Sequence, residues 1–113
     1  MNGTALVVDD DPSCRLVTRA MLERDGYRVL TAADGAEALA LAADEPEIGV
    51  VVTDSVLTDT GGRELASRLR RVLPRAAIVL TSGDHDPRGT RDFLAKPFEA
   101  RHLHALIESA LRR

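Results

Sequence analysis

The sequence predicts an α/β fold in which a parallel sheet carries helices on both faces. Three short runs of apolar and mostly β-branched residues, at 4–8, 48–53 and 76–80, have the composition of strands that are buried on both sides. Segments with apolar residues at helical spacing lie between these runs. An alternation of strands and helices needs right-handed crossovers, so we expect a doubly wound sheet of parallel strands.

Length and composition narrow the class of protein. The 113 residues suffice for one domain with its own core, so we expect a single domain over 1–113. A net charge of -3 offers no basic surface for nucleic acid, and the partners should be proteins or small anions. No apolar run approaches the roughly 20 residues of a membrane span. The one cysteine suits a reducing compartment, and we expect a cytoplasmic protein that binds no membrane.

Three acidic residues lie between the first predicted strand and the helix after it. The run at 4–8 is followed directly by Asp9, Asp10 and Asp11. The pair Asp11-Pro12 is typical of a helix start, where an acid caps the first turn and proline needs no N–H partner. Asp25-Gly26 should end this helix. Its apolar stripe is expected at Leu16, Val17, Ala20 and Met21.

The next elements lead to a carboxylate at the end of a buried strand. The segment 27–32 is a more polar strand, as is typical of a position nearer the edge of a sheet. Asp34-Gly35 begins a second helix, which Pro46 ends. The strand at 48–53 is almost wholly apolar and stops at Asp54. Asp54 is therefore expected at the carboxyl end of a central strand.

The second half of the chain holds two more strands and two more helices. A loop at 55–62 leads to a helix, and the strand at 76–80 ends at Thr81. The segment 82–92 contains glycine and proline and no large apolar side chain, which predicts an irregular loop with at most one helical turn. A short strand at 93–95, the pair Lys96-Pro97 and an amphipathic helix at 99–112 complete the chain.

Five residues that could form a reactive site are predicted to lie at one edge of this sheet. The carboxyl ends of parallel strands meet at the same edge, which is where ligands bind in open α/β sheets. Crowded carboxylates need a cation, and oxygen ligands without histidine or cysteine favour Mg²⁺. Hydroxyl and ammonium donors suit a bound phosphoryl group, and Asp54 could accept one as a nucleophile. These residues are Asp9, Asp10, Asp54, Thr81 and Lys96.

The chain resembles the receiver domain of bacterial two-component response regulators over residues 4–112. The motifs that carry the resemblance are Val-Asp-Asp-Asp-Pro at 8–12, Asp54 at the strand end, Thr-Ser-Gly at 81–83 and Lys-Pro-Phe at 96–98. The resemblance implies a flavodoxin-like sheet with strand order 2-1-3-4-5. It also implies a chain that catalyses only its own phosphorylation and dephosphorylation, and so is not an enzyme with a separate substrate.

The resemblance further assigns expected roles to individual residues. Asp54 would receive a phosphoryl group from a histidine kinase or a histidine phosphotransfer protein, with Lys96 and Thr81 beside it. Mg²⁺ would be held by Asp9, Asp10, Asp54 and the backbone carbonyl of Val56. Thr81 and Phe93 would be the switch residues that change a surface for a downstream protein or a second copy of the chain. The peptide bond between Lys96 and Pro97 is expected to be cis.

The sequence departs from the family pattern in two places. In the loop after Asp54, Thr58 stands where the family usually has proline and Gly61 where it usually has aspartate, while Gly62 matches. The connection between Thr81 and Lys96 is shorter than usual, so we expect a loop in place of the family's fourth helix. An absent helix should leave an apolar face bare around Phe93 and Ala95, open to a partner. No output domain follows in this sequence, so we expect a stand-alone or an excised receiver.

Two other functions fit the fold class less well. A flavodoxin-like domain that binds a small ligand such as FMN would need a phosphate-binding loop after the first strand, where the three acids would repel a phosphate. A Mg²⁺-dependent phosphatase with Asp54 as nucleophile would need a second acid two residues later, and Val56 stands there.

Overall fold

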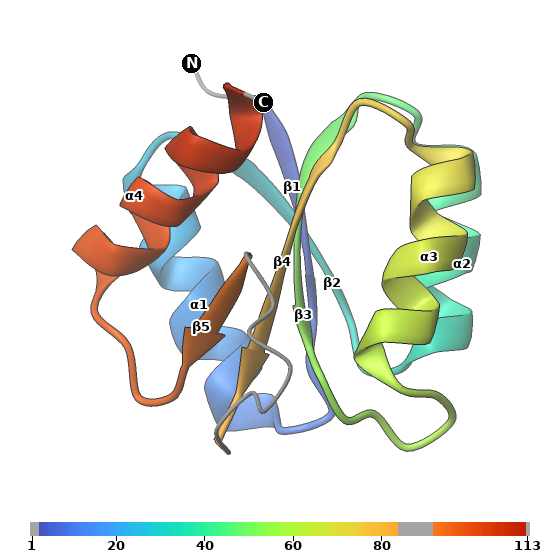
Figure 1. The fold of residues 1–113 in the computed structure, drawn as a ribbon, viewed down its shortest axis with the longest axis horizontal. Coiled ribbons are helices and arrows are strands. Elements are labelled where there is room, and N and C mark those ends of the chain that lie inside the picture. The colour runs from blue at the N-terminus through green and yellow to red at the C-terminus, as the bar shows by residue number, and fades with distance from the viewer. Residues whose placement is uncertain (1–2, 84–91, 113) are drawn as a thin grey trace.

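The computed structural model describes residues 3–83 and 92–112, and it arranges them as a five-stranded parallel sheet with four helices (Figure 1). The strand order is β2-β1-β3-β4-β5, as expected. None of the described helices has the length and apolar character needed to cross a membrane. The strands are β1 (Thr4–Val8), β2 (Arg28–Ala32), β3 (Ile48–Asp54), β4 (Ala77–Ser82) and β5 (Phe93–Ala95). The helices are α1 (Pro12–Arg24), α2 (Gly35–Asp44), α3 (Gly62–Val72) and α4 (Ala100–Leu111).

Two helices cover each face of the sheet (Figure 1). On one face α2 and α3 pack against alternate residues of the strands, and on the other face α1 and α4 pack against the residues between them. The three central strands are buried along almost their whole length, whereas the edge strands β2 and β5 are only partly buried. The fully buried runs in the sequence are thus the central strands, as predicted.

The buried face of α1 differs from the predicted one. Thr18 and Leu22 face the sheet, whereas Leu16 and Val17 are 64% and 53% exposed. The cap at Asp11 was predicted correctly, since its side chain accepts a hydrogen bond from the backbone N–H of Ser13 at 2.9 Å. A cap fixes where a helix begins but not which of its sides faces the sheet. The apolar stripe expected at Leu16 and Val17 is therefore wrong.

The face expected to be bare at β4 and β5 is only partly buried among the described residues. Leu80 and Phe93 are register partners on these two strands and so project to the same side of the sheet. Leu80 is only 5% exposed and Phe93 is partly buried, although Ala95 is exposed. This face thus combines a buried, a partly buried and an exposed side chain, and an exposed apolar patch around Phe93 stays a prediction. The predicted irregular loop at 82–92 falls mostly on residues 84–91, which lie outside the described part of the chain.

Candidate functional site

The carboxyl ends of β1 and β3 bring three acidic side chains together. These strands are neighbours, and Val8 pairs with Thr53, so the residues that follow the pair, Asp9 and Asp54, lie side by side. Carboxylate oxygens of Asp9, Asp10 and Asp54 all lie within 4.8 Å of one another. The predicted convergence of acids from two separate strands is thus present in the structure.

Asp9 is the most buried of the three acids and is held at four atoms. It is 3% exposed. Its Oδ1 accepts a hydrogen bond from the N–H of Asp11 at 3.0 Å, and its Oδ2 accepts one from Nζ of Lys96 at 2.9 Å. Its own N–H donates to the carbonyl of Ala32 at 3.1 Å. Its carbonyl accepts from Nη1 of Arg15 at 2.7 Å.

Arg15 is a residue of this site that the sequence analysis did not find. Its guanidinium reaches back from α1 to the turn that carries the acids, and so fixes the backbone at Asp9. The partner is a backbone carbonyl, which leaves no pattern of residue types in the sequence. The one available signal was the position of an arginine in the second turn of a helix that begins directly after the acids.

Lys96 bridges two of the acids. Its Nζ lies 2.9 Å from Oδ2 of Asp9 and 3.6 Å from Oδ2 of Asp54. Burial works to lower the pKa of this ammonium group, but the hydrogen bond from Lys96 to Asp9 and the charge of Asp54 outweigh it and raise the pKa. Lys96 is therefore a fixed positive charge at neutral pH. The bond between Lys96 and Pro97 is cis, as expected.

Asp54 is a poorly solvated carboxylate. Its side chain is 15% exposed. Burial is the largest cause that raises its pKa, and the negative charge of Asp9 adds to this effect. The charge of Lys96 and the N–H groups of Ser55 and Val56 act in the opposite direction and only partly compensate. A partly desolvated carboxylate beside a fixed ammonium group is suited to act as a nucleophile toward a phosphoryl group.

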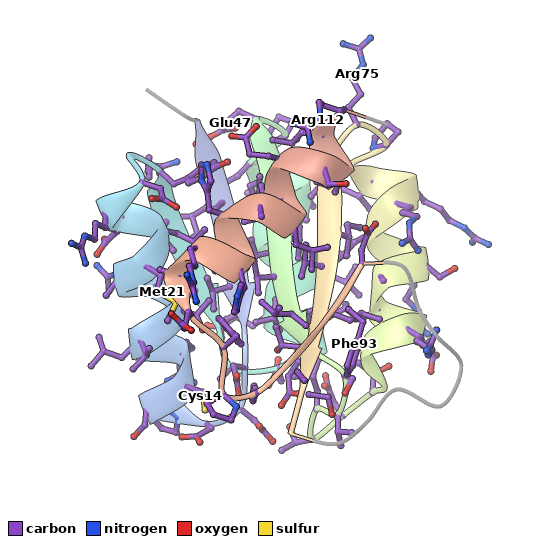
Figure 2. The ribbon with its side chains drawn as sticks, turned by 60° about the vertical axis from the view of Figure 1, so that its left-hand side comes forward. Cys14, Met21, Glu47, Arg75, Phe93 and Arg112 are labelled. Atoms are coloured by element: carbon purple, nitrogen blue, oxygen red, sulfur yellow. The ribbon has the colours of Figure 1, made fainter. Side chains whose placement is uncertain are left out.

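The two expected switch residues lie on successive strands beyond Asp54. Thr81 is the register partner of Asp54 and is 2% exposed. Its carbonyl accepts a hydrogen bond from the N–H of Ser55 at 2.7 Å, which ties β4 to the residue after the acid. Phe93 lies one strand further out, on β5 (Figure 2). The structure thus places Thr81 next to Asp54 and Phe93 on the strand beyond it.

The loop after Asp54 folds back onto the strand end. Val56 forms an antiparallel bridge with Gly61, and the side chain of Val56 is 67% exposed. Gly62, the first residue of α3, lies so close to the strand that a Cβ on it would be 2.4 Å from the carbonyl oxygen of Asp54 and 2.6 Å from Cα of Ser55. Only glycine fits this position without a shift of the backbone.

The donor set of this site fits a divalent cation with oxygen ligands. Asp10 is exposed, and within the described residues its side chain makes no hydrogen bond, so its carboxylate is available. Three carboxylates face one ammonium group, which leaves uncompensated negative charge at the edge of the sheet. Carboxylate and carbonyl oxygens are the ligands that Mg²⁺ prefers. Asp9, Asp10 and Asp54 could hold such an ion.

An apolar pocket of about 420 Å³ opens next to Lys96, between α1 and the segment that follows β5. Cys14 and Met21 mark its α1 side in Figure 2. The Cys14 thiol donates a hydrogen bond to Asp11 at 3.2 Å, which together with burial raises the pKa of Cys14 and keeps the thiol protonated. The residues that line the pocket are Ser13, Cys14, Val17, Thr18, Met21, Lys96, Pro97 and Phe98.

The sequence matches the response regulator receiver domain family over residues 5–108. It is 37% identical to the alkaline phosphatase synthesis transcriptional regulatory protein PhoP of Bacillus subtilis (strain 168), over all of this chain and 50% of that protein. It is 34% identical to the transcriptional regulatory protein AfsQ1 of Streptomyces coelicolor, over 96% of this chain and 51% of that protein. The chain therefore spans about half the length of these curated relatives.

Solved structures of the same class have the same fold. The receiver domain of the hybrid histidine kinase CckA is 32% identical and superposes with a TM-score of 0.83, over 96% of this chain and 99% of that chain. A response regulator protein from Burkholderia pseudomallei, solved with a phosphorylated aspartic acid, a calcium ion and citrate, is 27% identical with a TM-score of 0.87, over 98% of this chain and 69% of that chain.

Proposed function

This chain belongs to the family of response regulator receiver domains, and we propose that it is a Mg²⁺-dependent phosphorylation switch whose phosphoryl acceptor is Asp54. One observation carries the proposal. Carboxylate oxygens from Asp9, Asp10 and Asp54 lie within 4.8 Å of one another, and Lys96 reaches two of the three acids. A nucleophile, a cation site and a fixed positive charge therefore occupy one end of the sheet.

The phosphoryl donor is a phosphohistidine on a histidine kinase or a histidine phosphotransfer protein. A carboxylate oxygen of Asp54 forms a bond to phosphorus, and the P–N bond breaks with its electron pair returning to the imidazole nitrogen. Lys96, protonated at neutral pH, is placed to hydrogen-bond a phosphoryl oxygen. The chain acts only on its own phosphoryl group, and the reaction takes place in the cytoplasm.

Asp9, Asp10, Asp54 and the backbone carbonyl of Val56 would hold Mg²⁺. When bound, the ion supplies positive charge for the phosphoryl oxygens and compensates the three acids. Asp10 offers the most accessible of the side-chain ligands, because it is exposed and makes no hydrogen bond within the described residues. Asp9 and Asp54 offer the buried ones.

The switch passes through Thr81 and Phe93. A phosphoryl group on Asp54 adds hydrogen-bond acceptors beside Thr81, its register partner on β4. A shift of the Thr81 hydroxyl toward these acceptors moves the end of β4, to which β5 and Phe93 are paired. The surface that changes, at the end of β4 and at β5, binds a downstream protein or a second copy of this chain. A net charge of -3 disfavours a direct contact with nucleic acid.

Uptake of a phosphoryl group from acetyl phosphate tests the metal dependence of this function. We expect the intact mass of the parent chain to increase by one phosphoryl group in Mg²⁺ and to stay unchanged in EDTA. Asp10→Ala should remove the uptake, whereas Asp44→Ala, an exposed acid at the end of α2, should not. Equal uptake in EDTA and in Mg²⁺ would show that the proposed metal site is not used.

A further inference from the structure

The loop between β3 and α3 is fastened to the start of another helix, α2. The two carboxylate oxygens of Asp59, at the tip of this loop, accept hydrogen bonds from the N–H groups of Gly35 at 2.9 Å and Ala36 at 3.0 Å. Helix starts leave such N–H groups without partners inside the helix. Asp34, the residue before α2, takes a third one, from Glu37 at 2.8 Å. Asp59 therefore caps a helix that begins 24 positions before it in the sequence.

Packing shows that this contact is close. A Cβ on Gly35 would lie 2.5 Å from Cγ2 of Thr60 and 3.3 Å from Oδ1 of Asp59, so the loop rests directly on the first residue of α2. The hydrogen bonds from Gly35 and Ala36 lower the pKa of Asp59, which is therefore charged at neutral pH. A charged carboxylate is also favoured at a helix N-terminus by the helix dipole.

The loop receives no comparable anchor from its own helix. Gly61 occupies the cap position of α3 and provides no side-chain hydrogen bond. The loop instead closes on itself: the N–H of Leu57 donates to the carbonyl of Thr60 at 3.1 Å, and the N–H of Gly62 donates to the carbonyl of Ser55 at 2.8 Å. These bonds hold Ser55 and Leu57, the residues on either side of Val56, to the part of the loop that follows Asp59.

We propose that Asp59 is a positioning residue for the phosphoryl-acceptor site. Its contact with α2 sets the backbone at Val56, whose N–H lowers the pKa of Asp54 and whose carbonyl is a proposed metal ligand. The inference rests on the proposed function. Asp59 acts through the loop and touches neither the phosphoryl group nor the metal ion. Its role is thus comparable to that of residues that orient the ligands of a metal site.

Two alanine variants separate positioning from helix capping. Asp59→Ala and Asp34→Ala each remove a side chain that caps α2, but only Asp59 belongs to the loop. We expect Asp59→Ala to weaken Mg²⁺ binding, measured by calorimetry, by about 10-fold and to slow phosphorylation by acetyl phosphate. Asp34→Ala should leave both unchanged. Asp59→Asn keeps one acceptor oxygen and should recover part of the Mg²⁺ affinity.

Hydrogen exchange on the metal-free protein provides a readout that does not depend on activity. Asp59→Ala should speed exchange at 55–61, whereas Asp34→Ala should speed it only at the start of α2. If both variants lose Mg²⁺ affinity equally, Asp59 only caps the helix and the inference is wrong. It is also wrong if Asp59→Ala binds Mg²⁺ as the parent does. If the parent neither binds Mg²⁺ nor takes up a phosphoryl group, the proposed function is wrong. In that case the inference about Asp59 is still tested by hydrogen exchange, and it is wrong if Asp59→Ala leaves the exchange at 55–61 unchanged.

Discussion

The ion pair between Asp9 and Lys96 determines which acids are open to other partners. Both carboxylate oxygens of Asp9 already accept hydrogen bonds, one from Lys96 and one from the backbone. Asp10 is exposed and Asp54 is only partly compensated by Lys96. Asp10 would therefore be the most accessible ligand for a metal ion, and Asp9 and Asp54 could bind the ion only in competition with Lys96.

The positions of site residues were predictable from the sequence where the residue stands at the carboxyl end of a strand. Asp9, Asp54, Thr81 and Lys96 each stand where an apolar run stops, and a run of that kind ends at the sheet edge. Arg15 and Asp59 could not be found in this way. Both bind backbone groups, at Asp9 for Arg15 and at the start of α2 for Asp59, and a backbone group leaves no residue type to search for.

The phosphoryl group on Asp54 should be lost slowly. Hydrolysis needs a water molecule held in line with the P–O bond. The resemblance to receiver domains implies that the side chains that flank this path are two residues after Asp54 and two after Thr81. These are Val56, which is 67% exposed, and Gly83, and neither side chain can hydrogen-bond water. We expect Val56→Asn to speed the loss by about tenfold or more.

Release of labelled phosphate from the purified phosphorylated chain measures this rate. Val72→Asn is a matched control, since Val72 is also exposed but lies at the end of α3, away from the strand ends that carry the site. Loss of the parent's phosphoryl group within seconds would contradict the prediction, as would an equal effect of the two substitutions.

At the scale of whole elements, strands were easier to predict than the orientation of helices. A central strand is buried on both faces, so a continuous apolar run identifies it without any choice of side. A helix buries one side only, and in α1 the side that faces the sheet carries Thr18 and Leu22 while Leu16 is exposed. The start of α1 was predictable from its cap at Asp11 and its end from Asp25-Gly26, but the side that it buries was not.

The connection between β3 and α3 requires a glycine at position 62, the first residue of α3. Alanine is normally preferred over glycine in a helix. At Gly62, however, a Cβ would meet the backbone of Asp54 and Ser55 at 2.4 and 2.6 Å, so the backbone must move. We expect Gly62→Ala to lower the free energy of unfolding by about 2 kcal/mol and to displace Asp54.

Gly61→Ala is the matched control for this prediction. Nothing lies within 4 Å of a Cβ at Gly61, and its φ of -77° suits any residue. Urea unfolding should therefore show a small effect or a slight gain for Gly61→Ala. A loss of stability of the same size in both variants would mean that the close approach at Gly62 does not constrain this connection.

At the scale of the whole molecule, the strand order determines where the site forms. The order β2-β1-β3 places the connections after β1 and β3 on opposite faces of the sheet, and a crevice opens between the ends of such strands. The acids of the site come from those two strands. The alternating pattern of strands and helices in the sequence predicted this architecture.

The crowding of acids at this crevice should make the stability of the molecule depend on Mg²⁺. In the absence of an ion the three carboxylates repel, and an ion that binds only the folded state adds stability by mass action. At about 100 times the dissociation constant the gain is about 2.7 kcal/mol. The melting temperature of the parent should rise with the Mg²⁺ concentration, and that of Asp10→Ala should not. If the parent has the same melting temperature in saturating Mg²⁺ as in its absence, the proposed site is contradicted.

The most direct test of the account is the intact mass of the parent and of Asp54→Asn after the same incubation with acetyl phosphate and Mg²⁺. Asparagine keeps the size of the side chain but lacks the nucleophilic carboxylate oxygen. We expect one added phosphoryl group on the parent and none on Asp54→Asn. A parent that stays unmodified, or an Asp54→Asn variant that takes up a phosphoryl group as readily as the parent, would contradict the assignment of Asp54 as the acceptor.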